Sequence, residues 1–208
     1  MNNPSERINP TVGKTAISEK CLNQIFHDAR THSAWLTDPV PVEVLHRAYQ
    51  LAHLGPTSAN GSPARFVFLT TPAAKERLRP ALAPLNVEKT MTAPVTAIIA
   101  WDTEFHEKLP KLFPHADMRA FFVGKPALIE ETAFRNSSLQ GAYFIVAARA
   151  LGLDCGPMSG FDAAKLNTEF FPDGKWKANF LCNIGYGDPS KLFPRNPRLG
   201  FEEGARVL

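Results

Sequence analysis

A polar loop bounded by two prolines gathers hydrogen-bonding side chains at close spacing. Residues 55–66 read GPTSANGSPARF, so three hydroxyls and one carboxamide fall between Pro56 and Pro63. Each proline fixes its φ at about −65° and biases the residue before it toward an extended conformation. Such a stiff loop, rich in donors and acceptors, is typical of a ligand cradle. An ordinary capped turn uses the same residue types and stays open as an alternative.

Cationic side chains toward both ends of the chain could bind an anion. Arg30 follows an expected helix, and Lys191, Arg195 and Arg198 cluster near the C-terminus. Arginine and lysine pair with phosphate oxygens through charge-assisted hydrogen bonds, which are bidentate for arginine. Each of these cations could also be a solvated surface charge. Together with the loop, they predict dispersed recognition of an anionic, planar ligand.

Other motifs that carry chemistry are absent from the sequence. There is no G-x-G-x-x-G, no G-x-x-x-x-G-K-[ST] and no H-E-x-x-H. Ser159 lies one place too late for a G-x-S-x-G nucleophile. Cys21, Cys155 and Cys182 show no C-x-x-C spacing, so we expect reduced thiols rather than a disulfide framework or a metal site. No catalytic side chain and no metal ligand is therefore identified.

The composition is that of a soluble globular protein. The chain has 208 residues, of which 44% are apolar, and a formal net charge of +3. This charge is too small to favour a nucleic acid or an anionic membrane as a partner. No apolar run is long enough for a leader or a membrane span. We therefore expect a cytoplasmic protein with a flexible arm at residues 1–15 and one domain at residues 16–208.

The elements that would position these residues are helices and short strands. Apolar residues at helical spacing predict helices after Ser18, over residues 44–52 and over residues 128–151, and Thr71-Pro72 predicts the start of another. Short apolar runs predict strands at residues 66–69, 94–101 and 180–184. Residues 103–126 have no clear period and predict an irregular insertion.

The helix expected at residues 128–151 is apolar on most of its sides. A helix of this kind is buried all round. In a chain of this length, such burial suggests a sheet on one side and a second subunit on the other. The pattern therefore favours a homodimer.

The order of residues in the polar loop resembles that of a known family. Pro-Thr-Ser-x-Asn-x-Ser-Pro-x-Arg-Phe at residues 56–66 is similar to the Pro-Ser-Ser-x-Asn-x-Gln-Pro-Trp-Arg-Phe loop of flavin-dependent nitroreductases. The resemblance continues in order and spacing from about Cys21 to Val207. It includes residues 28–32 (DARTH), 131–138 (ETAFRNSS), 150–162 (ALGLDCGPMSGFD) and 183–188 (NIGYGD). These segments resemble the branch that reduces malonic semialdehyde in pyrimidine degradation.

The resemblance implies an α+β nitroreductase-like fold, with a central, mainly antiparallel sheet flanked by helices. It also implies a homodimer with two shared sites for FMN, and NADPH or NADH as the reductant. Asn60 is expected at the flavin pyrimidine edge, residues 56–58 approach from the neighbouring subunit, and residues 156–160 form a turn against flavin N5 and O4. The residues that the resemblance assigns to cofactor binding are Arg30, Thr31, His32, Ser33, Pro56, Thr57, Ser58, Asn60, Ser62, Pro157, Met158, Ser159, Gly160, Lys191 and Arg195.

The sequence departs from the family pattern at two places in this site. The segment after Arg30 lacks the second cation of the usual Arg-x-Ser-x-Arg or Lys, and Ser62 replaces the usual glutamine. A hydroxyl reaches less far than a carboxamide. The missing cation leaves the pyrimidine contacts open, with Ser33 and Asn60 as the expected substitutes, and the serine is expected to remove one contact to the cofactor.

The activity implied by the resemblance is a ping-pong reduction of malonic semialdehyde to 3-hydroxypropanoate in uracil degradation. Arg65 or Arg135 could bind the substrate carboxylate, and Ser62, His32 or water could supply the proton. General nitro, quinone or flavin reduction stays as an alternative, as does a flavin-binding protein without turnover. The expected partners are a second copy of the chain and a small aldehyde, nitro or quinone acceptor. The sequence does not distinguish NADPH from NADH.

Overall fold

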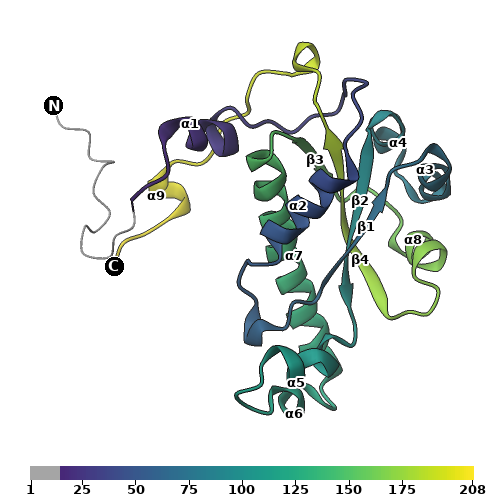
Figure 1. Cartoon of the computed structure of the whole chain (residues 1–208), viewed down its shortest axis with the longest axis vertical. Helices are drawn as coiled ribbons and strands as arrows, with labels where there is room; N and C mark the ends of the chain where they lie inside the picture. The colour runs from purple at the N-terminus through teal and green to yellow at the C-terminus, as the bar shows by residue number, and fades with distance from the viewer. Residues whose placement is uncertain (1–14) are drawn as a thin grey trace.

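The structure, a computed structural model, describes residues 15–208, which fold around a four-stranded sheet (Figure 1). The strands lie in the order β1-β2-β4-β3, and every neighbouring pair is antiparallel. Their bounds are Ala64–Leu69 for β1, Val95–Asp102 for β2, Asp154–Met158 for β3 and Trp176–Gly185 for β4. The predicted α+β fold with an antiparallel sheet is confirmed. The arm predicted for residues 1–15 lies outside the described residues, apart from Thr15.

Helices cover both faces of the sheet, with a hydrophobic cluster under each layer (Figure 1). One layer holds α2 (Val42–Ala52) and α7 (Pro126–Ala150), and the other holds α3 (Pro72–Leu78), α4 (Pro84–Thr92) and α8 (Ala163–Phe170). The short helices are α1 (Glu19–Leu22), α5 (Leu109–Leu112), α6 (Met118–Phe122) and α9 (Phe201–Gly204). Since both faces are covered, β2 is buried along its whole length. Among residues 15–208, no helix has both the length and the hydropathy to cross a membrane.

The two sides of the central helix α7 have different surroundings. On the sheet side, Gly141 lets the helix approach β4, because a Cβ there would lie 2.5 Å from the Phe180 ring. On its other side, Phe134, Leu139 and Tyr143 are 51%, 46% and 43% exposed. Within one chain, the predicted burial of this helix therefore holds for the sides that face the sheet and α2.

Two segments differ from the sequence-based expectation. Residues 156–158, expected in a turn, belong to β3, where Pro157 pairs with Cys182 of β4. Because β3 is an edge strand, its proline does not interrupt a second ladder. Residues 103–126, expected to be irregular, contain a 3₁₀ turn at Phe105–Lys108 followed by α5 and α6. These elements enclose a small hydrophobic cluster, which explains their order.

The chain beyond β4 leaves the body of the molecule. After a 3₁₀ turn at Pro189–Lys191 it crosses the upper end and descends to α9, which lies near α1 and apart from the sheet (Figure 1). Phe193, Leu199, Phe201 and Val207 on this C-terminal arm are 62% to 86% exposed. This segment therefore presents several large apolar side chains to its surroundings.

Candidate functional site

The predicted cations meet at one cavity of about 450 Å³, here called the anion cavity. Residues 26–33, before α2, and residues 191–198, on the C-terminal arm, form most of its walls. The predicted site residues that line it are Arg30, Thr31, Ser33, Lys191 and Arg195, and two further cations, Arg149 and Arg198, lie with them. Among the described residues that line it, none is acidic. Such a wall favours a negatively charged ligand.

Arg30 and Arg195 hold the two walls of the anion cavity together. Arg30 Nη2 donates to the Phe193 carbonyl at 2.6 Å. Arg195 Nη2 donates to the carbonyls of His27 at 2.6 Å and Ala29 at 2.9 Å. A guanidinium has five N–H donors, so these bonds leave others for a ligand. Both arginines can therefore shape the cavity and bind an anion in it.

His32 supports the wall of the anion cavity but does not line it. Its side chain is only 5% exposed, and its Nε2 lies 3.5 Å from Asp154 Oδ1, while Asp154 Oδ2 accepts the Gly187 N–H at 2.9 Å. A Cβ on Gly187 would overlap the imidazole ring, so this position needs glycine. The segment is further fixed because the His32 N–H donates to the Cys155 carbonyl at 3.2 Å.

The polar loop at residues 56–62 has an unusual backbone. Ala59, Asn60 and Ser62 have positive φ angles of 50°, 51° and 42°. Residues other than glycine seldom adopt this region, and they keep it only where the surrounding structure holds them. Strained backbone of this kind is concentrated at binding and catalytic sites. The backbone of the loop is therefore held in one conformation, which gives the loop a defined surface.

Side chains from within and outside the loop fix its shape. Thr57 Oγ1 accepts the Ser62 N–H at 3.1 Å, which closes the loop on itself. Asn136 Oδ1 of α7 accepts the Ser58 N–H at 2.8 Å. Asn136 is 4% exposed, and its position is fixed in turn, because its Nδ2 donates to the Thr132 carbonyl at 2.8 Å. The loop is thus anchored to the central helix.

Helix α4 fixes the segment at residues 157–160. The Gly160 carbonyl accepts the Ala83 N–H at 3.0 Å and Asn86 Nδ2 at 2.7 Å. A Cβ on Gly160 would lie 2.5 Å from Asn86 Nδ2, so only glycine permits this approach. Pro157 and Ser159 are exposed, whereas Met158 is 8% exposed and packs inward. Pro157 and Ser159 are therefore the members of this segment that reach the surface.

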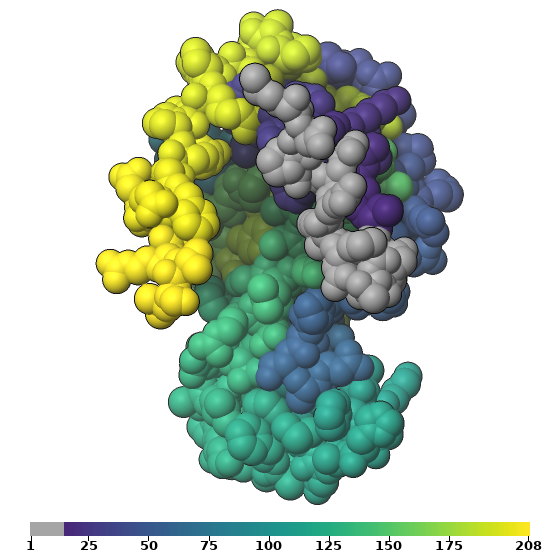
Figure 2. All heavy atoms as spheres, turned by 90° about the vertical axis from the view of Figure 1, so that its left-hand side faces the viewer, coloured from purple at the N-terminus to yellow at the C-terminus, as the bar shows by residue number. Residues whose placement is uncertain are grey.

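One chain keeps the predicted site residues in separate places. The C-terminal arm leaves the body at one end of the molecule, whereas the loop lies at the other end near α5 and α6 (Figures 1 and 2). No residue of the loop lines the anion cavity, and Ser62 instead borders a different cavity of about 710 Å³. Within a single chain, the arginines and the loop therefore cannot contact one small ligand together.

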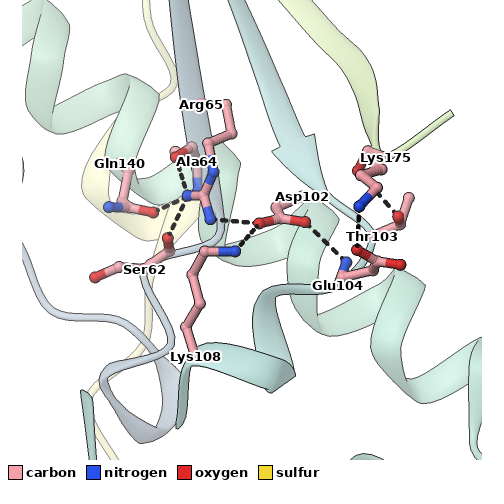
Figure 3. Close-up of polar contacts among 9 residues, drawn as sticks. All are labelled: Ser62, Ala64, Arg65, Asp102, Thr103, Glu104, Lys108, Gln140 and Lys175. Carbon is pink, nitrogen blue, oxygen red and sulfur yellow. Dashed lines mark hydrogen bonds and ion pairs between the residues drawn. The ribbon is translucent and has the colours of Figure 1, made fainter. Parts of the chain in front are cut away.

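The two arginines considered for a substrate carboxylate are both paired with acidic residues. Arg65 Nη2 lies 2.5 Å from Asp102 Oδ2, and the arginine side chain is 17% exposed (Figure 3). Arg135 pairs with Glu131 one turn earlier on α7 and is 64% exposed. Arg65 is therefore committed to contacts inside the protein, whereas Arg135 stays accessible.

The cysteines and histidines offer no separate catalytic centre. In the part of the chain that the structure describes, no three His, Cys, Asp or Glu side chains are grouped so that they could hold a metal ion. Cys155 and Cys182 are buried free thiols on neighbouring strands. The hydrogen bond with Cys155, together with burial, raises the pKa of Cys182, so this thiol stays protonated. A buried, protonated thiol is a poor nucleophile.

Comparison with known proteins identifies the family. The sequence profile described as "Nitroreductase family" matches residues 28–186. The chain belongs to the nitroreductase family. A relative from Ralstonia nicotianae, named "Putative NADH dehydrogenase/NAD(P)H nitroreductase", is 62% identical to this nitroreductase over 187 residues, which cover 90% of this chain and 96% of the relative.

Solved structures share the fold of this nitroreductase. A "putative nitroreductase in complex with FMN" from Exiguobacterium sibiricum has a TM-score of 0.80 at 17% identity, covering 94% of this chain and all of its own. A nitroreductase family protein from Streptococcus pneumoniae has a TM-score of 0.77 at 20% identity, covering 90% and 98%. At these identities the likeness establishes the fold alone.

In this nitroreductase, two polar residues near the site were not predicted from the sequence. Arg149 reaches the anion cavity from the last turn of α7, and Asn136 anchors the loop from the middle of the same helix. Asn136 lies in a run of polar residues, Arg135 to Ser138, and nothing in that run distinguishes it, whereas Arg149 lies in an apolar stretch at the end of the helix. The 131–138 segment that resembles the family contains Asn136, and this was the available clue.

Proposed function

We propose that this nitroreductase is an FMN-dependent NAD(P)H oxidoreductase. The observation that carries the proposal is the anion cavity, whose walls supply five cations: Arg30, Arg149, Lys191, Arg195 and Arg198. A phosphate monoester carries a charge of about −1.5 to −2 at neutral pH and accepts several hydrogen bonds. This donor set fits the FMN phosphate, and the hydroxyls of Thr31 and Ser33 add to it. The names of the Ralstonia and Exiguobacterium proteins agree with this cofactor and reductant.

The chain's own residues hold and shield the cofactor. Bound FMN supplies hydride transfer from NAD(P)H to the acceptor. The loop at residues 56–62 and the segment at residues 157–160 provide hydrogen-bonding groups for the flavin ring. Of the two side chains considered as proton donors, Ser62 is half-buried and borders a cavity, whereas His32 is buried against Asp154. Ser62 is therefore the better placed of the two.

The proposed site needs two copies of the chain. Since the loop and the anion cavity lie at opposite ends of one molecule, a shared site has to take them from different subunits (Figure 1). Figure 2 shows a hollow between the C-terminal arm and the body, with α7 at its floor. The exposed apolar face of α7 and the apolar arm offer a surface for the second copy. We infer a homodimer built on these surfaces.

We further propose malonic semialdehyde as the acceptor, which takes up a hydride and a proton to give 3-hydroxypropanoate. The support is the resemblance of residues 150–162 and 183–188 to that branch of the family. General nitro or quinone reduction is the second candidate, and the name of the 62% identical relative favours it. The two candidates differ in the acceptor and share the cofactor.

Anaerobic visible spectroscopy tests the cofactor and the acceptor in turn. Purified protein reconstituted with FMN should lose its flavin absorbance when NADPH or NADH is added and regain it with malonic semialdehyde. Bleaching that is reversed by a nitroaromatic or a quinone but not by the aldehyde would support the second candidate. If the protein binds FMN but neither nucleotide bleaches it, a flavin-binding protein without turnover is indicated. Failure to bind FMN would overturn the proposal.

A further inference from the structure

A cluster of charges around a buried aspartate lies at the C-terminal side of the polar loop (Figure 3). Its centre is Asp102, the last residue of β2, which is 2% exposed. The Asp102 carboxylate accepts hydrogen bonds from Arg65 Nη2 at 2.5 Å, Lys108 Nζ at 2.9 Å and the Glu104 N–H at 2.8 Å. A carboxylate with these partners is satisfied and holds Arg65 in one orientation.

Arg65 also donates to backbone carbonyls at the end of the loop and the start of β1. Its Nη1 donates to the Ser62 carbonyl at 3.0 Å and to the Ala64 carbonyl at 2.7 Å (Figure 3). The Ala64 N–H in turn donates to Gln140 Oε1 of α7 at 2.8 Å. The planar guanidinium thus connects the Asp102 carboxylate with the carbonyls of Ser62 and Ala64. A lysine ammonium at the same place could not bond all three acceptors with this geometry.

The carbonyl that Arg65 binds belongs to a residue with a strained backbone. Ser62 has a φ of 42°, and Ala59 and Asn60 earlier in the loop also have positive φ. Such residues return to ordinary conformations unless neighbouring groups hold them. The Thr57 hydroxyl holds the N–H of Ser62, and Arg65 holds its carbonyl. The backbone N–H and the backbone carbonyl of Ser62 are therefore both bonded to side chains.

The same cluster connects the loop to the 103–126 insertion. Lys108, in the 3₁₀ turn of the insertion, reaches Asp102 although its own side chain is 52% exposed. Asn60 Nδ2 donates to the Leu112 carbonyl of α5 at 2.8 Å, which makes a second link. Ala59 packs against the hydrophobic cluster that contains Phe105 and Leu109. The loop and the insertion therefore form one connected unit.

We propose that Arg65, oriented by Asp102, is a positioning residue that holds Ser62 in its left-handed conformation and so presents the loop to the flavin. The flavin part of this inference rests on the proposed function, whereas the effect on the loop does not. Stability alone is a weaker explanation of the cluster, because a buried ion pair often contributes little net free energy. The bond to the Ser62 carbonyl gives this pair a specific task.

Hydrogen exchange measured by mass spectrometry on the protein without FMN tests the effect on the loop. Arg65→Lys keeps the charge beside Asp102 but cannot bind the carboxylate and both carbonyls together. We expect exchange of the peptide that spans residues 56–66 to rise about tenfold, while the β2 peptide at residues 95–101 stays protected. Lys108→Met is the matched control, because it removes a partner of Asp102 and leaves the Arg65–carbonyl bonds in place. Unchanged loop protection in Arg65→Lys, or an equal loss in Lys108→Met, would overturn the proposal.

A rescue experiment separates a left-handed backbone from a general loss of structure. Glycine adopts positive φ without strain, so Ser62→Gly should make the loop less dependent on Arg65. We expect Arg65→Lys to weaken FMN binding about tenfold in the natural background and clearly less in the Ser62→Gly background. This difference would show that the effects of the two substitutions are coupled. Equal losses in both backgrounds would contradict the proposed role of Arg65 in presenting the loop. If the unmodified protein does not bind FMN, the proposed function fails, and the exchange experiment still decides whether Arg65 holds the loop.

Discussion

The cations of the anion cavity have different structural duties. Arg30 and Arg195 bind backbone carbonyls of the opposite wall, so replacing either would disturb the cavity itself. Lys191 is exposed and lines the cavity at the start of the C-terminal arm. Lys191 is therefore the better probe for an electrostatic contact. Its loss removes a charge and leaves the hydrogen bonds of Arg30 and Arg195 between the cavity walls intact.

Lys191→Gln should weaken FMN binding about tenfold, because a hydrogen bond to a charged group contributes about 1.5–3 kcal/mol. Riboflavin lacks the phosphate, so its affinity should not change. Fluorescence titration with both ligands measures the difference. Lys177→Gln, an exposed charge on β4 outside the anion cavity, serves as the control and should leave both affinities unchanged. Equal weakening for FMN and riboflavin in Lys191→Gln would contradict a phosphate contact.

Asp102 should make the stability of the protein sensitive to acid. Burial alone would raise its pKa, but the hydrogen bonds from Lys108 and Glu104 and the charges of Arg65 and Lys108 hold the pKa below its ordinary value. A carboxyl with a lowered pKa in the folded state stabilises that state above the unfolded-state pKa, and this contribution is lost as the pH falls through the folded-state pKa. The effect therefore belongs to the range below about pH 4.

Thermal unfolding measured between neutral pH and pH 2 checks this expectation. The natural protein should lose stability more steeply below about pH 4 than Asp102→Asn, which has no proton to gain at this position. The variant should be less stable at neutral pH, because Arg65 then lacks its carboxylate partner. Parallel pH profiles in the two proteins would show that Asp102 does not contribute to the acid sensitivity.

Among the elements, the contact between α7 and β4 has little tolerance for added volume. Gly141→Ala would usually stabilise a helix by about 1 kcal/mol. Here the new methyl group would lie 2.5 Å from the Phe180 ring, so helix and strand would have to separate. Overpacking of this kind costs about 1–3 kcal/mol, and we expect a net loss in the free energy of unfolding. Urea unfolding measures this free energy. Adding Phe180→Leu to Gly141→Ala should recover part of the loss. A more stable Gly141→Ala protein would show that α7 and β4 accommodate the added methyl group without strain.

Elements with a continuous sequence pattern were predicted well, and those shaped by their neighbours were not. The apolar run at residues 94–101 and the helical spacing at residues 128–151 correspond to β2 and α7. β3 was missed because Gly156 and Pro157 both disfavour a strand, and only pairing with β4 makes one there. The positive φ of Ala59 and Ser62 had no signal either, since these residue types do not favour it. Their conformation depends on Arg65, Thr57 and α7.

For the whole molecule, residue types indicated the components of the site but not their arrangement. Arg30, Lys191 and Arg195 were grouped by their charge, and the structure brings them to one cavity. The loop was expected at the same ligand, yet in one chain it is anchored to the middle of α7, away from the Arg149 end that borders the cavity (Figure 1). Distances across a fold depend on long-range packing, which local sequence patterns do not contain. The expectation from the family resemblance that residues 56–58 come from a neighbouring subunit offers a way to join the two parts.

Leu139→Glu should convert the protein to a monomer that does not retain FMN. Leu139 is 46% exposed on α7 between Phe134 and Tyr143, and burying a carboxylate there in a subunit interface would carry a large desolvation cost. Leu85→Glu is the matched control, because Leu85 is 92% exposed on α4, which covers the other face of the sheet. Sedimentation velocity gives the mass of each variant, and absorbance at the flavin band gives its occupancy.

The two readouts together decide whether the site is shared between subunits. A shared site requires mass and occupancy to fall together in Leu139→Glu and neither to change in Leu85→Glu. If Leu139→Glu were a monomer that kept FMN, one chain would hold the cofactor without the loop of a second copy. If it stayed a dimer, the exposed face of α7 would not be the interface. Either result would mean that the separation of the loop and the anion cavity within one chain has another explanation.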